Sequence, residues 1–137
     1  MKEELKGPEV TSISVAVVAE KNELNETIYN VYLINEYDVT IRGVLVSSKG
    51  YGKHPDSEEM IKTSMLRHFL DDIPPKSFKK VEPIIEDVFG LNNEYWVSFW
   101  INNVMHDKKF IFLPEVIQPS NFVQVPILEK KGVLISS

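Results

Sequence analysis

The chain has 137 residues, a hydrophobic fraction of 43%, a charged fraction of 26% and a formal net charge of −5 at pH 7. This length predicts a single domain over residues 11–137, preceded by a flexible N-terminal segment, residues 1–10. The acidic balance argues against nucleic acid and against an anionic membrane surface as partners, because both require a basic face on the protein. Since the sequence contains no cysteine, disulfides, a thiolate nucleophile and cysteine-ligated zinc are excluded.

The N-terminal residues MKEELKGPEV are charged and contain no apolar run, so a signal peptide is not expected. The longest uninterrupted apolar run, residues 15–19, has only five residues, which is too short to span a membrane. We therefore expect a cytoplasmic protein.

Three segments in the first part of the chain alternate apolar and polar residues, as a half-buried strand does. Residues 11–20, 27–35 and 39–48 are rich in β-branched side chains, and each predicts a strand. Gly43 lies inside the third segment and predicts a bulge or a close approach of another group to the backbone. The composition of residues 49–57, KGYGKHPDS, predicts a surface loop.

Residues 58–72 fit both a strand and a helix. Ile61, Met65 and Phe69 have helical spacing, and this periodicity slightly favours a helix. We therefore expect that one short helical turn can occur, either within residues 58–70 or over residues 83–89.

Prolines mark a corner and an edge in the segment FLDDIPPKSFKKVEPI, residues 69–84. Pro74 and Pro75 set an extended or turned backbone that cannot join a central ladder, and Pro83 confines residues 78–85 to an edge strand. The segment therefore predicts a sandwich corner that leads to an edge. Pairs of lysines fit the protection of edge strands against pairing with another chain, at residues 79–80, 108–109 and 130–131.

Residues 95–103, YWVSFWINN, give the strongest strand pattern in the chain. The turn MHDK is expected to join them to a second strand, residues 109–114, in a hairpin. Residues 121–128 and 133–136 complete a series of about seven to nine short β segments, which is typical of an antiparallel β-sandwich or barrel.

The runs VYLINEYDVTIRGVLVSSKGYG, IPPKSFKKVEPI and YWVSFWINN are similar in layout to small immunoglobulin-like β-sandwich domains of bacterial proteins. In those domains a strand ends at an asparagine, a turn leads to a second strand, and a proline-containing corner precedes an edge strand. The resemblance covers about residues 11–115 and rests on this pattern. It implies an all-β, immunoglobulin-like antiparallel β-sandwich of about seven to nine strands, and it favours a strand over residues 60–70.

The three histidines, His54, His68 and His106, do not have the i,i+2 or i,i+4 spacing of many metal sites, so we interpret them as solvated or locally bonded. We assign no catalytic residue, metal or cofactor. The competing interpretation is a small metal-dependent hydrolase. It requires two histidines and a carboxylate within about 5 Å of one another in the fold.

The strand predicted at residues 95–103 carries aromatic side chains on both faces, although a half-buried strand usually leaves one face polar. Trp96, Ser98 and Trp100 share one face, and they are our candidate binding surface. The structural alternative is that Trp96 or Trp100 covers the sheet beneath a long loop. We predict a non-enzymatic binding module whose partner is another protein or a second copy of the chain. A carbohydrate-binding domain that uses Trp96 and Trp100 is the alternative function.

Overall fold

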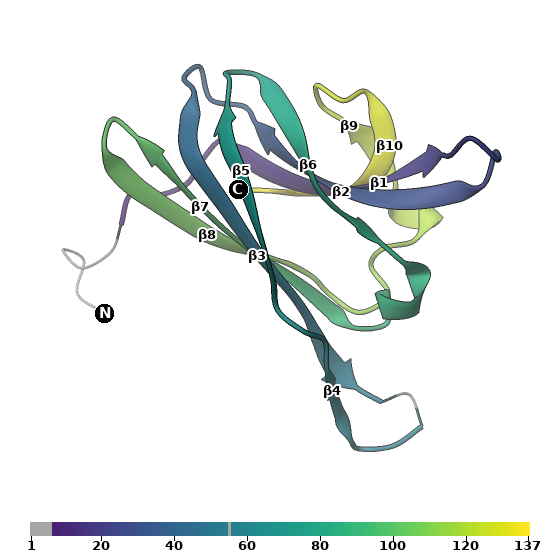
Figure 1. Cartoon of the computed structure of the whole chain (residues 1–137). Coiled ribbons are helices and arrows are strands. Elements are labelled where there is room, and N and C mark those ends of the chain that lie inside the picture. Colours follow the sequence, from purple (N-terminus) through teal and green to yellow (C-terminus); the bar gives the residue numbers. More distant parts are fainter. Residues whose placement is uncertain (1–6, 55) are drawn as a thin grey trace.

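The computed structural model describes residues 7–54 and 56–137, and in this part of the chain it is all-β, with two antiparallel sheets (Figure 1). Sheet A has the strand order β6-β2-β1-β10-β9. Its strands are β1 (Ile13–Lys21), β2 (Thr27–Asn35), β6 (Ser77–Ile84), β9 (Val123–Val125) and β10 (Lys130–Ser136). Sheet B has the order β4-β3-β7-β8, and β5 also pairs with β3. Its strands are β3 (Ile41–Lys53), β4 (Met60–Lys62), β5 (Leu66–Ile73), β7 (Asn92–Ile101) and β8 (Val104–Phe112).

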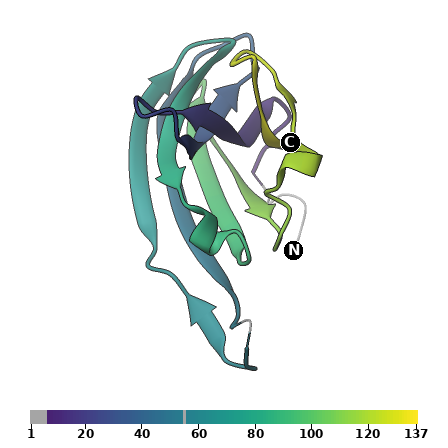
Figure 2. The ribbon, with the colours of Figure 1, turned by 90° about the vertical axis from the view of Figure 1, so that its right-hand side faces the viewer.

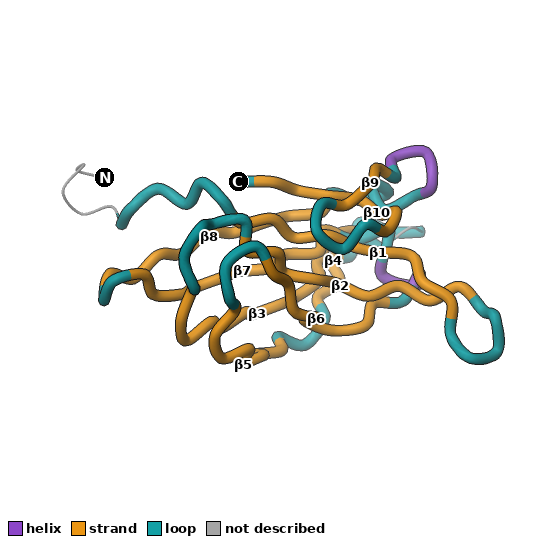
Figure 3. Tube along the Cα trace, turned by 90° about the horizontal axis from the view of Figure 1, so that it is seen from above, coloured by secondary structure: helices purple, strands orange, loops and turns teal. Residues whose placement is uncertain are grey.

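The predicted all-β class is confirmed. The described residues form ten strands where seven to nine were expected, because the three-residue strands β4 and β9 add short ladders to the edges of the two sheets. Figure 3 shows that strands make up most of the chain. The helical turn expected over residues 83–89 is present as a single 3₁₀ turn, η2 (Glu86–Val88), and a second 3₁₀ turn is η3 (Pro119–Asn121).

The slight preference for a helix within residues 58–70 was wrong. This segment forms β4, which pairs with residues 51–53, and the start of β5, which pairs with residues 41–48. The loop predicted over residues 49–57 is shorter than expected, because β3 continues to Lys53 and projects with β4 beyond the body of the molecule (Figure 2). Gly50 and Gly52 are buried in this extension, where Thr63 and Leu91 pack closely against them.

The hairpin formed by β7 and β8 turns at Asn102 and Asn103, and not at the predicted MHDK segment. Both asparagines have positive φ angles, 49° and 63°, as the tight two-residue hairpin turn requires. Asparagine adopts this conformation at lower cost than most residues because its short polar side chain bonds locally. Residues 104–108 are therefore part of β8.

The core lies between the sheets and contains large side chains from both. Its largest fully buried members are Tyr95, Phe99, Phe110 and Phe112 of sheet B, together with Ile13 and Leu33 of sheet A. A second, smaller apolar cluster lies on the other face of sheet A, and it contains Ala16, Val18, Ile34 and Val125. The two clusters explain why β1 is buried on both faces from Ile13 to Val18.

At the N-terminal end, residues 1–6 of the predicted flexible segment lie outside the described residues. Val10 belongs to the same predicted segment, and it is buried in the main core with 4% of its surface exposed. The described residues contain no helix with the length and apolar character needed to cross a membrane.

Two of the three lysine pairs lie on sheet edges, as predicted, because β6 ends sheet A and β8 ends sheet B. Pro83 lies on the same edge strand, β6, which confirms its predicted position. The assignment of Lys130 and Lys131 to an edge was wrong, since β10 lies between β1 and β9. Lys130 instead forms an ion pair with Glu20 of the neighbouring strand β1.

The Glu20 carboxylate on sheet A is expected to control stability in acid. Burial raises its pKa, but hydrogen bonds from Lys130, Tyr32 and Asn30 outweigh this effect and lower the pKa from 4.5 to about 2. Because the pKa is lower in the folded state, the ionised carboxylate stabilises the fold fully above pH 4.5. This stabilisation is lost as the pH falls toward 2. Glu20→Gln should therefore reduce the free energy of unfolding by roughly 1–2 kcal/mol at pH 7. This value allows for solvent screening, because Lys130 is half exposed. At pH 2–3 the reduction should be smaller. Urea unfolding at both pH values measures this difference, and an equal loss at the two values would contradict it.

Candidate functional site

The outer face of sheet B carries exposed apolar side chains from four strands. Trp96 and Trp100 are 47% and 45% exposed, whereas Tyr95, Val97 and Phe99 alternate with them and are buried in the core. This alternation follows from the pleat, which directs successive side chains to opposite faces. We call this surface the tryptophan face. It consists of Leu45 and Ser47 from β3, Phe69 from β5, Trp96, Ser98 and Trp100 from β7, and Met105 and Asp107 from β8.

The ladder registers make these residues neighbours. Leu45 lies opposite Phe69 on one side and opposite Ser98 on the other. Met105 lies opposite Trp100. The structure thus brings the predicted residues Trp96, Ser98 and Trp100 together on one surface. The exposure of both tryptophans does not fit the alternative in which a long loop within the described residues covers Trp96 or Trp100.

Neighbouring side chains fix the Trp96 ring. Its Nε1 donates a hydrogen bond to Asp107 Oδ2 at 3.0 Å, and Lys109 Nζ lies 4.8 Å from the ring centre. The cation over the ring contributes about 0.5–1 kcal/mol at an exposed site. Because the ring is already oriented, a partner that contacts it loses less side-chain entropy on binding.

Trp100 rests on a bulge in β3, where the sequence predicted either a bulge or a close approach. Both are present, since the register shifts between Arg42 and Leu45 and Gly43 has a φ of 56°. A Cβ at Gly43 would lie 3.3 Å from Trp100 Cδ1. Asp72 holds the bulge by accepting hydrogen bonds from the Gly43 amide and from Arg42 Nη1, each at 3.0 Å. Asp72 thus lies in β5.

A shallow hollow of 210 Å³ lies beside Trp96 on the tryptophan face. The small side chains of Ser47 and Ser98 form part of its lining, with Trp96, Leu45 and Met105 as apolar walls. Asp107 adds a carboxylate to the lining. The hollow therefore combines an indole ring with hydroxyl groups and a hydrogen-bond acceptor.

The three histidines occupy separate local environments. His54 accepts a hydrogen bond from the backbone amide of Asp56, His106 stacks on Phe99, and His68 contacts Glu82. The described residues contain no group of three or more histidine, aspartate or glutamate side chains suited to holding a metal ion. The condition stated for the hydrolase alternative is therefore not met in this part of the chain.

A polar cluster that the sequence reasoning missed is centred on Glu82, at the opening between the sheets. Glu82 belongs to β6 of sheet A, and its carboxylate reaches three strands of sheet B. Oε1 accepts a hydrogen bond from Ser48 at 2.8 Å and lies 2.6 Å from His68 Nε2, while Oε2 accepts one from the Tyr95 hydroxyl at 3.0 Å. Burial, together with the Glu82 charge, raises the pKa of Tyr95 well above its ordinary value, so the phenol remains a neutral donor.

Ser48, His68 and Glu82 are residue types that occur in hydrolytic triads, but their arrangement differs. In a triad the histidine contacts the serine nucleophile and the acid orients the histidine from the other side. Here the serine and the histidine both contact the same carboxylate oxygen. The cluster is therefore a carboxylate with three partners and not a serine activated by a base.

A bulge explains why the sequence reasoning missed Glu82. Strict alternation along residues 78–85 places Glu82 and Ile84 on the same face as Phe78. In the structure the register of β2 with β6 shifts between Val31 and Tyr32. The shift lets Val81 and Ile84 both enter the core, and it directs Glu82 toward sheet B. A bulge of this kind leaves no clear signal in the residue types of β6.

No family model, no curated protein and no solved structure matches the chain.

Proposed function

We propose that this chain is a non-enzymatic protein-interaction module that binds its partner through the tryptophan face. One observation carries the proposal. Trp96 and Trp100 are almost half exposed on a sheet face, and the Trp96 ring is held in place by Asp107 and Lys109. A fixed, exposed aromatic side chain is suited to act as an anchor residue in an interface.

The chemistry around the tryptophans also fits a protein partner. Interface centres are enriched in tryptophan, phenylalanine, methionine and arginine, and their rims are polar. Phe69 and Met105, on the same face of sheet B as the tryptophans, are 65% and 49% exposed. The charged residues Arg67 and Lys109 lie on the same strands as Phe69 and Met105, respectively, and add polar groups near these apolar side chains.

The proposal includes the immunoglobulin-like arrangement that the sequence resemblance implies. The order β6-β2-β1 in sheet A and the order β3-β7-β8 in sheet B support it, because they correspond to strands E-B-A and C-F-G of that arrangement. The remaining strands are then additions at the edges of this framework. The absence of cysteine is compatible with a reducing compartment, and a cytoplasmic location remains part of the proposal.

A photo-crosslinking amino acid placed on the tryptophan face should capture the partner in cells. We expect chains that carry it at position 69 or 105 to form a discrete crosslinked product. The matched control carries it at position 24, because Leu24 is 78% exposed but lies in the turn between β1 and β2. The product should decrease at least tenfold when Trp96→Ala and Trp100→Ala are added, since anchor residues of this kind contribute about 2 kcal/mol or more each.

Mass spectrometry of the product decides between partners. A product that contains only this chain identifies a second copy, and a product that contains another protein identifies a different partner. Equal crosslinking from position 24, or no product from positions 69 and 105, would overturn the proposal.

The hollow beside Trp96 favours a second candidate, a carbohydrate-binding domain. Indole rings stack on sugars, and the Asp107 carboxylate in the lining is able to accept hydrogen bonds from sugar hydroxyls. The position of Lys109 argues against this candidate, because Lys109 already lies over the Trp96 ring on which a sugar would stack. Saturable quenching of tryptophan fluorescence by polysaccharides tests it directly, and unchanged fluorescence would remove it.

A further inference from the structure

A pocket of about 330 Å³, separate from the tryptophan face, lies where the two sheets move apart. The strands β5 and β6 are close at the proline corner and diverge toward η2 (Figure 1). The Glu82 cluster lies in this opening. We call the space the Glu82 pocket, and its lining includes Ser48, Thr63, Leu66, Glu82, Ile85 and Val88.

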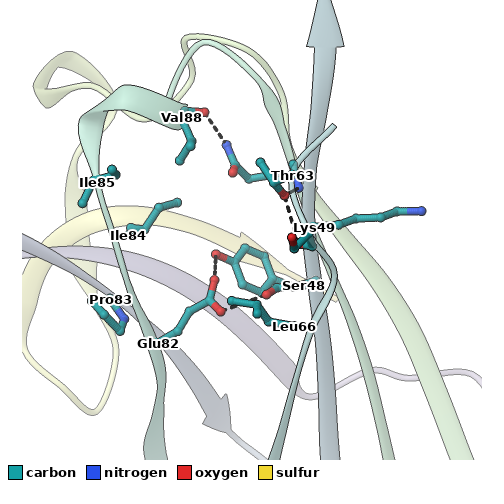
Figure 4. A pocket seen from close by; sticks show the side chains of 13 residues that line it. Ser48, Lys49, Thr63, Leu66, Glu82, Pro83, Ile84, Ile85 and Val88 are labelled. Carbon is teal, nitrogen blue, oxygen red and sulfur yellow. Dashed lines mark hydrogen bonds between the residues drawn. The ribbon is translucent and has the colours of Figure 1, made fainter. Parts of the chain in front are cut away.

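The walls of the Glu82 pocket are mainly apolar. Figure 4 shows Ile84, Ile85 and Val88 on one side of the space, with Leu66 near Glu82. Ile85 and Leu66 are 61% and 51% exposed, although residues of this type usually bury their side chains. The volume lies at the lower end of the range for small-molecule sites, which combine apolar walls with a few polar groups. An apolar chain or ring that enters the pocket would cover these side chains.

The floor of the pocket offers one more hydrogen bond to a ligand. An ionised carboxylate accepts about four hydrogen bonds. Glu82 has three partners in the structure, of which two are at Oε1 and one is at Oε2. A ligand that reaches Oε2 must therefore be a donor, because a second acceptor at this position would face the carboxylate charge without a proton between them.

The charge in the pocket favours a cationic donor. Among the described residues that line it, the charged side chains are Glu82 and Lys49. Lys49 points away from the pocket in Figure 4, and its Nζ lies 3.7 Å from Glu94 on the outer face of sheet B. No basic group of this lining is thus directed inward to hold an anion.

We propose that the Glu82 pocket binds a small primary amine with an apolar chain or ring. The ammonium group donates a hydrogen bond to Glu82 Oε2, and the apolar part contacts Leu66, Ile85 and Val88. This inference does not depend on the tryptophan face, so the two proposals can fail separately.

Three ligands with the same chain length and different head groups test the proposal on the full chain at pH 7. Isothermal titration with octylamine, octanol and octanoate, each kept below its micelle concentration, compares their affinities. We expect octylamine to bind at least tenfold more tightly than octanoate, with octanol between them. Backbone amide shifts in a ¹⁵N-labelled sample should change at Thr63, Ile85 and Val88.

Two variants locate the interaction, and one serves as a control. Glu82→Gln should weaken octylamine binding about tenfold. Ile85→Lys should have a similar effect without touching the cluster, because it places a positive charge on an exposed residue at the pocket. The control is Leu24→Lys, which makes the same change in charge at a distant exposed leucine and should leave the affinity unchanged. If Glu82→Gln fails to fold, Ile85→Lys decides the result.

The proposal is overturned if octanoate binds as tightly as octylamine, or if none of the three ligands binds. It is also overturned if Ile85→Lys has no larger effect than Leu24→Lys. Amide shifts confined to the tryptophan face would likewise contradict the assignment, and they would support the interaction module instead.

Discussion

Replacement of Gly132 by alanine is expected to lower the free energy of unfolding by about 3–5 kcal/mol, and to lower the melting temperature by roughly 10–15 °C. Gly132 is buried in β10 opposite Val18 of β1. A Cβ at this position would lie 2.3 Å from the carbonyl oxygen of Val17 and 3.0 Å from Val18 Cα. These are backbone atoms of a central strand, so a change of side-chain rotamer cannot relieve the contact. The strands β1 and β10 would have to separate.

Gly90→Ala is the matched control for this substitution. A Cβ at Gly90 would lie 3.3 Å from Glu115 Oε1, which is the end of a flexible side chain that can move away. We expect an effect below about 1 kcal/mol. Chemical denaturation of both variants measures the difference. If Gly132→Ala were as stable as Gly90→Ala, the close approach of β10 to β1 would be incorrect.

Local patterns were sufficient to predict most strands. The segment predicted at residues 27–35 is strand β2, Thr27–Asn35, with the same bounds, because a polar turn precedes it and apolar residues occupy both of its faces. The assignment of Trp96, Ser98 and Trp100 to one face follows from the two-residue repeat alone. This repeat held because the register of β7 with β8 is regular from Asn93 to Ile101.

Prediction failed where long-range pairing overrides local composition. Residues 49–53 contain two glycines and two lysines, which is typical of a loop, yet β7 pairs with residues 49–51 and β4 with residues 51–53. The helical spacing of Ile61, Met65 and Phe69 was misleading for a related reason. Met65 and Phe69 are exposed, so their spacing does not mark a buried helical face. The pairing of β3 with β5 and with β7 joins residues that are distant in the sequence, so a local window does not contain it.

The missed site has the same physical origin. Glu82 reaches Ser48, His68 and Tyr95, which lie on three other strands. No local motif joins these four residues. Only the fold and the irregular register of β6 bring them together. The tryptophan face was accessible to sequence reasoning because a single regular strand carries its main residues.

Removal of the Glu82 carboxylate should have the second largest effect on stability. We expect Glu82→Ala to lower the free energy of unfolding by about 2–4 kcal/mol, because it leaves Ser48, His68 and Tyr95 without their shared acceptor at a largely buried position. This loss is smaller than the loss expected when one partner of a fully buried ion pair is removed, because the His68 side chain is 27% exposed. Glu82→Gln keeps the shape of the side chain and should cost less, about 1–2 kcal/mol.

Glu23→Ala provides the control, because Glu23 is exposed in the turn between β1 and β2 and its loss should change the stability by less than about 0.5 kcal/mol. Urea unfolding of Glu82→Ala, Tyr95→Phe and the double variant then separates the contributions. If the hydrogen bond between Glu82 and Tyr95 contributes to stability, the stability losses of the two single variants should sum to more than the loss in the double variant. Additive losses would mean that this hydrogen bond contributes nothing measurable.

The pH dependence of the same variants gives an independent test of the contact. The pKa of Tyr95 is raised in the folded state, first by burial and then by the charge of Glu82, from an ordinary value of 10.0. The unfolded chain therefore releases the phenol proton at a lower pH than the folded chain does. The contribution of Tyr95 to the free energy of unfolding is therefore fully present below pH 10, and it decreases as the pH rises above this value. Tyr95→Phe should accordingly lose stability less steeply than the parent chain above pH 10, and identical slopes would show that the phenol is not held as a neutral donor between the two sheets.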